Sequence, residues 1–185
     1  MMNAGHLLSV FVLYPKAVKK RFNIIRREKP RQDGKMNIKI KKEELNENLA
    51  KTLLDYSKLW EAEDSCYGYH ANSEGDIEGR DIFVAYDGEK AAGYLFGIRT
   101  NAKENSQAIP AGTPIFEIEE IFVLPEYRSH GIGGMLFTEC EKEISDIEYF
   151  TLSTGTKNYK SIMHFYIEMM GMTFRSARLF KKKVK

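Results

Sequence analysis

The feature that most limits how this chain can fold is a strand, a glycine-rich turn and a helix in direct succession between residues 115 and 144. Residues 115–124 are rich in β-branched and aromatic side chains and are followed by Pro125, as expected of a strand. Glycine then occupies positions 131, 133 and 134. Apolar residues after the turn share one helical face: Ile132, Met135, Leu136, Cys140 and Ile144. The segment predicts a helix packed on a sheet, with a sharp turn at the strand end.

The glycine turn is suited to a phosphate group. Glycine lets the backbone approach a ligand closely and lets successive N–H groups point the same way. The helix behind the turn adds the partial positive charge of its N-terminus, and Arg128 supplies a charged donor. The spacing G-x-G-G does not match the dinucleotide fingerprint, and Met135 and Leu136 stand where a P-loop needs Lys and Ser or Thr. A phosphate site of another kind and a tight turn without a ligand both stay open.

Short strands and amphipathic helices alternate along the rest of the chain. Strands are predicted at 36–40, 82–86, 93–99 and 149–153, and Asp87-Gly88 turns the second of these into the third. Helices are predicted at 41–60 and 158–170, with Gly171 ending the second. Residues 61–81 are an acidic loop or broken helix, and 172–184 have the content of one or two further strands. This order predicts the α/β class, with a mixed central sheet flanked by helices on both faces.

The composition indicates one globular domain with an acidic body. Of the 185 residues, 43% are hydrophobic and 29% are charged. Residues 36–180 hold 15 basic and 24 acidic side chains, a balance that attracts small cations and repels nucleic acid. Cys66 and Cys140 are far apart and in no metal-like spacing, so we expect no metal site and a reduced, cytoplasmic compartment. Cys140 is expected in the core and Cys66 in the acidic loop.

Residues 1–35 differ from the remainder and are predicted to form a basic N-terminal extension ahead of a domain at 36–185. They hold nine Lys or Arg and two acidic residues. The apolar patch at 7–13 is shorter than a membrane span of ~20 residues and lacks the features of a secretory signal, so a soluble protein is expected. Three interpretations stay open for the segment: an extension upstream of a start at Met36, a helix packed on the body or on a second subunit of a homodimer, or a membrane-surface anchor.

The turn and the strand before it resemble the GNAT superfamily of N-acetyltransferases. The pyrophosphate signature of that family, Gln/Arg-x-x-Gly-x-Gly/Ala, is matched by Arg128, Gly131 and Gly133 at the same spacing. The strand in that family commonly ends in Val-x-Pro-Glu-Tyr-Arg, and residues 123–128 here are Val-Leu-Pro-Glu-Tyr-Arg. The element order resembles the family over about residues 36–183.

A second match to the family lies in the last predicted helix. The family has an Asn that opens this helix and a Tyr before a closing Gly-Phe, matched here by Asn158, Tyr166, Gly171 and Met172. The step from Tyr166 to Gly171 is five residues where the family usually has four. Either the helix bulges or Tyr166 is not the equivalent tyrosine.

The resemblance implies a GNAT-like acyl-CoA N-acyltransferase fold with acetyl-CoA as co-substrate. Turn residues would bind the pyrophosphate, backbone groups at the strand end would pair with the pantetheine arm like an added strand, and an Asn would add a contact. The residues implied for cofactor binding are Phe122, Val123, Arg128, Ser129, His130, Gly131, Ile132, Gly133, Gly134 and Asn158. The imidazoles of His130 and His164 are taken as turn and surface groups, because neither belongs to a nucleophile motif.

The resemblance also implies a general base on the strand and a proton donor on the last helix. The family frequently places the base four positions before the Val, which is Glu119 here. Strict alternation puts Glu117 and Glu119 on the face of Ile121, and Glu120 on the other. A bulge is common in this strand of the family, so Glu120 stays a candidate, and an exposed strand edge is the alternative for all three acids. Tyr166 is the candidate acid for the leaving thiolate, with a purely packed core tyrosine as its alternative.

The acceptor is expected to be a primary amine. The region where the family builds its acceptor site holds seven carboxylates: Glu61, Glu63, Asp64, Glu74, Asp76, Glu78 and Asp81. They favour a small cationic acceptor, resembling an aminoglycoside or a polyamine, although a solvated loop would have the same composition. A peptide or protein amine, and a CoA-binding protein without catalysis, are the alternatives.

Overall fold

The computed structural model describes residues 36–106, 108–176, 179, 181 and 183. The predicted basic extension at 1–35 lies outside the described residues. Within the described part, no helix combines the length and apolar character needed to cross a membrane.

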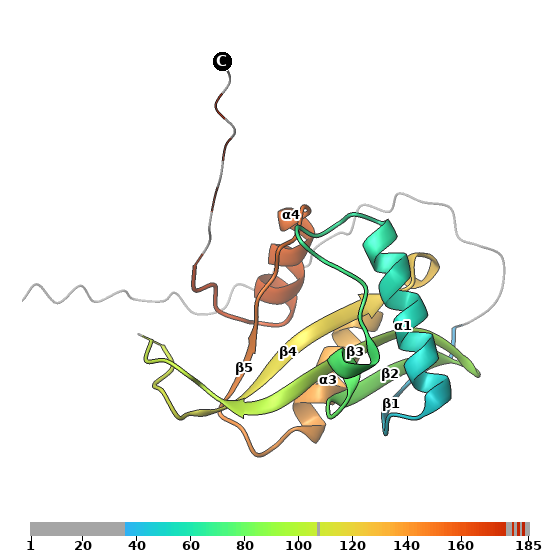
Figure 1. The fold of residues 1–185 in the computed structure, drawn as a ribbon, viewed down its shortest axis with the longest axis horizontal. Coiled ribbons are helices and arrows are strands. Elements are labelled where there is room, and N and C mark those ends of the chain that lie inside the picture. The colour runs from blue at the N-terminus through green and yellow to red at the C-terminus, as the bar shows by residue number, and fades with distance from the viewer. Residues whose placement is uncertain (1–35, 107, 177–178, 180, 182, 184–185) are drawn as a thin grey trace, which may run out of the picture. The chain divides into compact units, whose positions relative to one another are not determined.

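The framework of the fold is a five-stranded sheet whose strands lie side by side in chain order (Figure 1). The strands are β1 (Ile38–Glu43), β2 (Asp81–Asp87), β3 (Lys90–Asn101), β4 (Pro114–Val123) and β5 (Tyr149–Leu152). The first four pair antiparallel, and β5 joins β4 in parallel. The predicted hairpin through Asp87-Gly88 is therefore confirmed as β2–β3, and the sheet is mixed as predicted.

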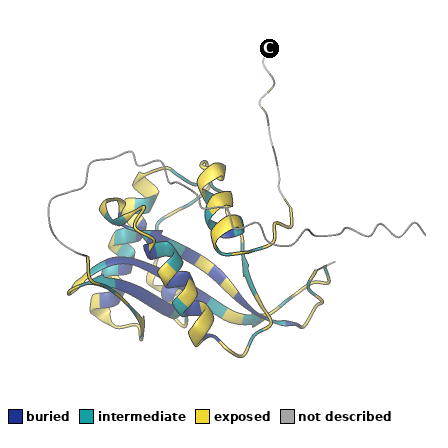
Figure 2. Ribbon diagram, turned by 180° about the vertical axis from the view of Figure 1, so that it is seen from behind, coloured by how far each residue is buried: buried dark blue, intermediate teal, exposed yellow. Residues whose placement is uncertain are grey.

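Helices cover both faces of the sheet, which confirms the predicted α/β architecture. Helices α1 (Glu47–Ala62) and α2 (Glu74–Ile77) pack on one face, where Leu49, Leu53 and Ile77 join one buried cluster. Helix α3 (Ile132–Glu143) packs on the other face with Tyr166 of the C-terminal helix. That last helix consists of α4 (Tyr159–Met163) and the π-helix η2 (His164–Met169). Figure 2 shows the central strands buried and the outer sides of the helices exposed.

The start of α1 differs from the prediction, and a capping residue explains the difference. Strand β1 continues to Glu43, and the helix begins only at Glu47. Asn46 precedes it in extended conformation, and its side-chain oxygen accepts a hydrogen bond from the Leu49 N–H at 3.0 Å. The cap satisfies one of the N–H groups that a helix leaves unpaired at its start, and so fixes the boundary.

A β-bulge in β4 changes which side chains face which layer. Phe96 of β3 pairs with Glu120, whereas the next residue, Gly97, pairs with Ile118. Glu119 is therefore the extra residue, and the alternation of side chains reverses across it. Ile118 and Ile121 consequently both contact the α3-side core. The expectation from strict alternation, that Glu117 and Glu119 share a face with Ile121, is wrong for this reason.

Strands β4 and β5 are paired only over the first half of β4. Their parallel pairing runs from Ile115 opposite Tyr149 to Ile118 opposite Leu152 and stops there, at the bulge. The second half of β4 thus has its β5-side edge without a partner strand among the described residues, and the two strands diverge (Figure 1). An edge of this kind is a template for an additional extended chain.

The C-terminal region corrects one prediction and resolves another. Residues 172–176, 179, 181 and 183 lie in no strand, so the expected strand there is wrong for the described residues. The five-residue step from Tyr166 to Gly171 has a structural cause, because the π-helix η2 accommodates one residue more per turn, with the Met170 N–H bonded to the Phe165 carbonyl at 3.0 Å. Gly171 then ends the helix in left-handed conformation, with φ +69°.

Candidate active site

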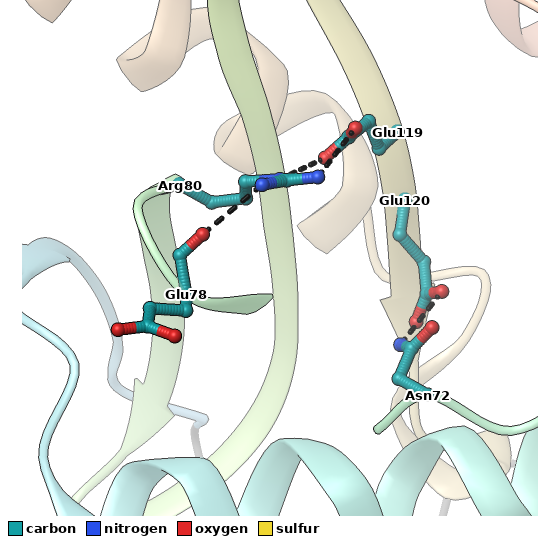
Figure 3. A network of polar contacts seen from close by, with 5 residues as sticks. All are labelled: Asn72, Glu78, Arg80, Glu119 and Glu120. Atoms are coloured by element: carbon teal, nitrogen blue, oxygen red, sulfur yellow. Dashed lines mark hydrogen bonds and ion pairs between the residues drawn. The ribbon is translucent and has the colours of Figure 1, made fainter. Parts of the chain in front are cut away.

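A buried carboxylate lies at the centre of the site. Glu120 is only 5% exposed, on the α1 side of the sheet. Its Oε1 accepts a hydrogen bond from the hydroxyl of Tyr94 on β3. Its Oε2 accepts from the Tyr69 hydroxyl at 3.1 Å and from the Asn72 side-chain amide at 3.0 Å (Figure 3 shows the Asn72 contact). Three donors from two parts of the chain therefore hold one acid.

The environment of Glu120 makes it a better proton acceptor than an ordinary carboxylate. Burial raises its pKa, and the hydrogen bonds from Tyr94, Asn72 and Tyr69 offset part of that rise. Burial also raises the pKa of Tyr94 and of Tyr69, and the neighbouring Glu120 adds to the rise in both. The two tyrosines consequently stay protonated and act as donors to the acid.

The neighbouring acid, Glu119, has a different setting. It is the bulged residue, and its carboxylate is bound by Arg80 through Nε at 2.6 Å and through the second terminal nitrogen at 3.1 Å (Figure 3). Arg80 is itself fixed by donating to the carbonyl of Glu78 at 3.0 Å. A bidentate guanidinium pair of this kind neutralises the carboxylate. The two predicted candidates are thereby separated, one paired with a cation and one held by neutral donors.

The glycine turn has the geometry of an anion cradle. Ser129 and Gly131 both adopt left-handed backbone conformations, with φ of +62° and +79°. Gly131 is the N-cap of α3, and a Cβ built on it would meet nothing within 4 Å. The first N–H groups of α3 have no partner inside the helix and carry its positive dipole end. Residues 129–134 therefore fit the predicted phosphate site.

The other two glycines of the turn also have a packing role. A Cβ on Gly133 would lie 3.3 Å from the ring of Phe165, and one on Gly134 would lie 3.4 Å from the Cε of Met170. Phe165 belongs to the C-terminal helix, and Met170 is its C-cap. The absence of side chains at these positions thus lets that helix pack closely on α3, beside the start of the turn.

Val123 presents its backbone to the open edge of β4. The N–H of Leu124 donates to Ala92 on β3 at 2.9 Å, and successive residues of a strand alternate, so the peptide groups of Val123 point away from β3. Arg128 confirms this direction, because its Nε donates to the Val123 carbonyl at 2.8 Å. Phe122, by the same alternation, turns its peptide groups to β3 and its side chain into the α1-side core.

Arg128 is directed at α1 rather than at the turn. Its terminal nitrogen forms an ion pair with Glu63 at 2.7 Å, and its guanidinium lies over the ring of Phe122 at 5.3 Å. The guanidinium is thus engaged by Glu63, Phe122 and Val123, and its contact with a phosphate stays a prediction. The imidazoles of His130 and His164 are exposed, as expected.

The C-terminal helix carries two further predicted residues, of which Tyr166 lies in the core on the α3 side. Asn158 is its N-cap and accepts a hydrogen bond from the Ser161 N–H at 3.4 Å. Tyr166 is 8% exposed, and burial raises the pKa of its hydroxyl. The thiol of Cys66 lies close enough to add to that rise, and the pKa of Cys66 is in turn raised by burial, with Glu120 contributing. Cys140 is fully buried, as expected.

The acidic loop after α1 is tied to the loop after β5. Cys66 pairs with Thr156 in an isolated antiparallel bridge, and the Tyr67 N–H donates to the Gly155 carbonyl at 2.7 Å. The Lys157 ammonium binds Asp64 at short range. The loop is thereby held over the side of β4 on which the strands diverge.

Several of the seven predicted acids already have basic or capping partners. Glu61 contacts His70 at 3.3 Å, Glu63 pairs with Arg128, Asp64 with Lys157, and Asp81 with Lys42 and Arg99. Asp76 caps α2 through Ser73. The negative charge available to a cationic ligand is therefore smaller than the count of carboxylates suggests.

Sequence reasoning missed the groups that hold the two glutamates. Tyr69 and Asn72 are 51 and 48 residues from Glu120, and Tyr94 is 26 residues away. Nothing local marks these residues, because their role depends on strand register and on the path of the loop. Among the described residues, no cluster of His, Cys, Asp and Glu could hold a metal ion.

The described residues form an α/β fold in which a buried carboxylate, a strand edge without a partner strand and a left-handed glycine turn follow one another along β4 and the start of α3. The model of the Acetyltransferase (GNAT) family matches residues 46–172. The chain therefore belongs to this family and is an acetyltransferase. A search of curated protein sequences finds no match.

Solved structures share the fold at low sequence identity. An aminoglycoside acetyltransferase from an uncultured soil metagenomic sample, in complex with trehalose, has a TM-score of 0.56 and 18% identity, covering 80% of this chain and 97% of that chain. The aminoglycoside N-acetyltransferase AAC(6')-Iy in complex with CoA has a TM-score of 0.56 and 17% identity, covering 79% and 94%. A transcriptional regulator from Bacillus halodurans C-125 has a TM-score of 0.58 and 16% identity, covering 79% and 99%. At these identities the likeness shows the fold.

Proposed function

We propose that this acetyltransferase moves an acetyl group from acetyl-CoA to a primary amine, with Glu120 as the general base. The observation that carries the proposal is the position of the buried carboxylate of Glu120. It lies in β4, three residues before Val123, whose backbone faces the open edge of that strand. Glu120 and Val123 belong to β4, and the glycine turn follows directly. Base, strand edge and phosphate cradle are thus arranged along one continuous segment.

The donor would be held by main-chain groups. The N–H groups at the start of α3, with the left-handed turn at Ser129 and Gly131, would bind the pyrophosphate. The N–H of Val123 points to the open edge of β4, where an extended pantetheine arm would pair as an added strand. That N–H would also polarise the thioester carbonyl. The role of Asn158 would be a side contact from the C-terminal helix.

The base has a defined energetic task. An amine of pKa ~10.4 is protonated at pH 7, and removing that proton costs roughly 4.6 kcal/mol. Glu120 would accept the proton, aided by the burial that raises its pKa. The neutral nitrogen would then attack the thioester carbonyl, the C–S bond would break with its electron pair on sulfur, and the remaining excess proton of the nitrogen would pass to solvent. Tyr166, kept protonated by burial, would give its proton to that sulfur.

The proposed acceptor is a small cationic amine, resembling an aminoglycoside or a polyamine. Two of the structures with this fold are named as aminoglycoside acetyltransferases, and the loop beside Glu120 carries the seven acids described above. The partial pairing of those acids means that recognition would rest on few carboxylates. A peptide amine is the competing acceptor class.

A two-stage experiment tests the proposed function. Calorimetric titration of the full chain with acetyl-CoA should show saturable binding, and a panel of amines should then release free thiol in an acceptor-dependent manner. Turnover of polyamines or aminoglycosides that is weakened by salt supports the cationic acceptor, whereas turnover confined to peptides of particular sequence supports the other class. Saturable CoA binding without turnover on any amine would contradict the proposed catalysis, and no binding at all would contradict the cradle as well.

A further inference from the structure

Glu120 is enclosed by its own hydrogen-bond donors. Tyr94 occupies Oε1, while Tyr69 and Asn72 occupy Oε2. With 5% of its surface exposed, the acid has little room for direct contact with an incoming amine. A general base must reach the proton it removes directly or through one water, and a side-chain hydroxyl can take the place of that water. One of the three donors is therefore a candidate for that intervening group.

The chemistry of the three donors separates them. Tyr94 is fully buried, so it cannot meet an acceptor. Asn72 donates from an amide nitrogen, whose lone pair is delocalised into the carbonyl and does not accept a proton. The Tyr69 oxygen donates to Glu120 and also takes a hydrogen bond from the Ser57 side chain, which leaves one lone pair for a further partner, and its residue is partly exposed. Only a hydroxyl of this kind can accept on one side while donating on the other.

The position of Tyr69 is fixed by its neighbours rather than by Glu120 alone. Its ring lies against Trp60 of α1 with centroids 4.4 Å apart. Trp60 is anchored by its indole N–H, which donates to Ser65 at 2.9 Å. Beyond Tyr69, the Asn72 N–H donates to the buried hydroxyl of Ser57 at 3.0 Å. The loop segment is thus tied to α1 on both sides of Tyr69, which holds the hydroxyl in place.

We propose that Tyr69 is a catalytic proton relay between the acceptor amine and Glu120. The inference rests on the proposed function and adds a residue that touches the acceptor. In the step, the Tyr69 oxygen takes the proton from the amine nitrogen as the Tyr69 hydroxyl proton passes to Oε2 of Glu120. Tyr69 begins and ends neutral, Glu120 ends protonated, the C–N bond forms, and the electron pair of the C–S bond leaves with sulfur.

The test compares Tyr69→Phe with Tyr149→Phe as the matched control. Both changes remove one phenol hydroxyl and keep the ring, and Tyr149 lies on the edge strand β5, 40% exposed. The values of kcat/KM are measured against pH for both variants and the unaltered chain, and thermal unfolding checks that each variant is folded. The expected result is a loss of about tenfold or more in Tyr69→Phe, with Tyr149→Phe unchanged.

The pH profile distinguishes a relay from a residue that only tunes Glu120. The Tyr69 hydrogen bond lowers the pKa of Glu120, so removing it shifts the acid limb of the profile to higher pH in either case. If Tyr69 is a relay, kcat/KM of Tyr69→Phe stays below that of the unaltered chain on the plateau of the profile, at pH values above the acid limb. A variant that recovers the full plateau rate overturns the relay while leaving the proposed function intact. Failure of the unaltered chain to turn over any amine overturns both.

Discussion

Glu119 and Glu120 are adjacent in β4, yet Arg80 binds the first through two nitrogens while the second accepts only from neutral groups. The bulge makes this possible, because Glu119 is the unpaired extra residue and Glu120 resumes the pairing with Phe96. Arg80 holds Glu119 at 2.6 Å, with 30% of the Glu119 side chain exposed. The guanidinium therefore neutralises the charge next to the buried acid, and Glu120 is the carboxylate that fits the proposed base.

Exchanging each glutamate for glutamine should give unequal results. Glu120→Gln removes the proposed base and should lower kcat/KM by about 10²- to 10⁴-fold. Glu119→Gln keeps one acceptor oxygen for Arg80 and should lower the rate far less. Thiol release with a single amine acceptor measures both. Equal losses, or a larger loss for Glu119→Gln, would assign the base to Glu119 instead.

The raised pKa of Glu120 predicts a pH dependence of activity. The base works only when deprotonated, so kcat/KM should rise through a pKa that lies above that of an ordinary glutamate. Acceptor amines also titrate, so the profile is measured with two acceptors of different pKa. The limb that belongs to Glu120 should stay at the same pH for both acceptors. A profile that moves entirely with the acceptor would show that no enzyme group titrates there.

The same shift predicts how stability varies with pH. A carboxyl whose pKa is raised on folding contributes stability below its unfolded pKa, and this contribution is lost as pH rises through the folded pKa. The melting temperature of the unaltered chain relative to Glu120→Gln should therefore fall across that window, because glutamine does not ionise. Melting curves from acid to neutral pH measure the difference. A difference that stays constant would mean that burial does not raise the pKa.

Local sequence signals predicted the parts of the fold that depend on neighbouring residues. The strand, turn and helix at 115–144 and the hairpin at Asp87-Gly88 are where patterning and turn chemistry placed them. The prediction of a strand at 172–184 is wrong for the described residues, because residues with high β-propensity do not form a strand without a neighbouring strand to pair with. The five-residue step from Tyr166 to Gly171 did carry a signal, and the π-helix is its physical cause.

The candidate site could be predicted only in part, because it depends on contacts between residues that are distant in the sequence. A pair of acidic residues could be seen in the strand, but which of them is buried depends on the bulge, and the bulge depends on pairing with β3. Gly97 was the available clue, since a glycine inside a strand often marks a bulge or a close backbone approach. Tyr69, Asn72 and Arg80 lie between α1 and β2 and could not be placed without the path of that segment, and Tyr94 of β3 could not be placed without the strand register.

The left-handed turn can be tested with two glycines of similar geometry. Gly131 and Gly112 have φ of +79° and +85°, and a Cβ on either meets nothing within 4 Å. Asparagine tolerates this conformation better than other side chains. Gly131→Asn should keep the fold but weaken acetyl-CoA binding about tenfold or more by filling the cradle, whereas Gly112→Asn in the β3–β4 loop should bind normally. Calorimetric titration gives both affinities, and normal binding by Gly131→Asn would place the pyrophosphate elsewhere.

Gly97 should be indispensable for the bulge itself. A Cβ at this position would meet the carbonyl oxygen of Glu117 and lie 2.7 Å from the ring of Phe116, which is fully buried. Neither the Glu117 backbone nor the packed Phe116 ring has room to move away from an added methyl group. Gly97→Ala should therefore lower the free energy of unfolding by about 1–3 kcal/mol. It should also displace Glu120, so activity should fall more than the loss of folded protein accounts for.

The matched control is Gly75→Ala in α2, where an added Cβ would lie 3.9 Å from the Ser73 hydroxyl, an ordinary contact. Alanine is the better helix former, so this variant should be as stable as the unaltered chain or slightly more so. Chemical denaturation measures both variants, and kcat/KM is then compared at equal amounts of folded protein. If Gly97→Ala is as stable and as active as Gly75→Ala, strand β4 can hold Glu120 without a close approach from β3, and the bulge does not depend on glycine.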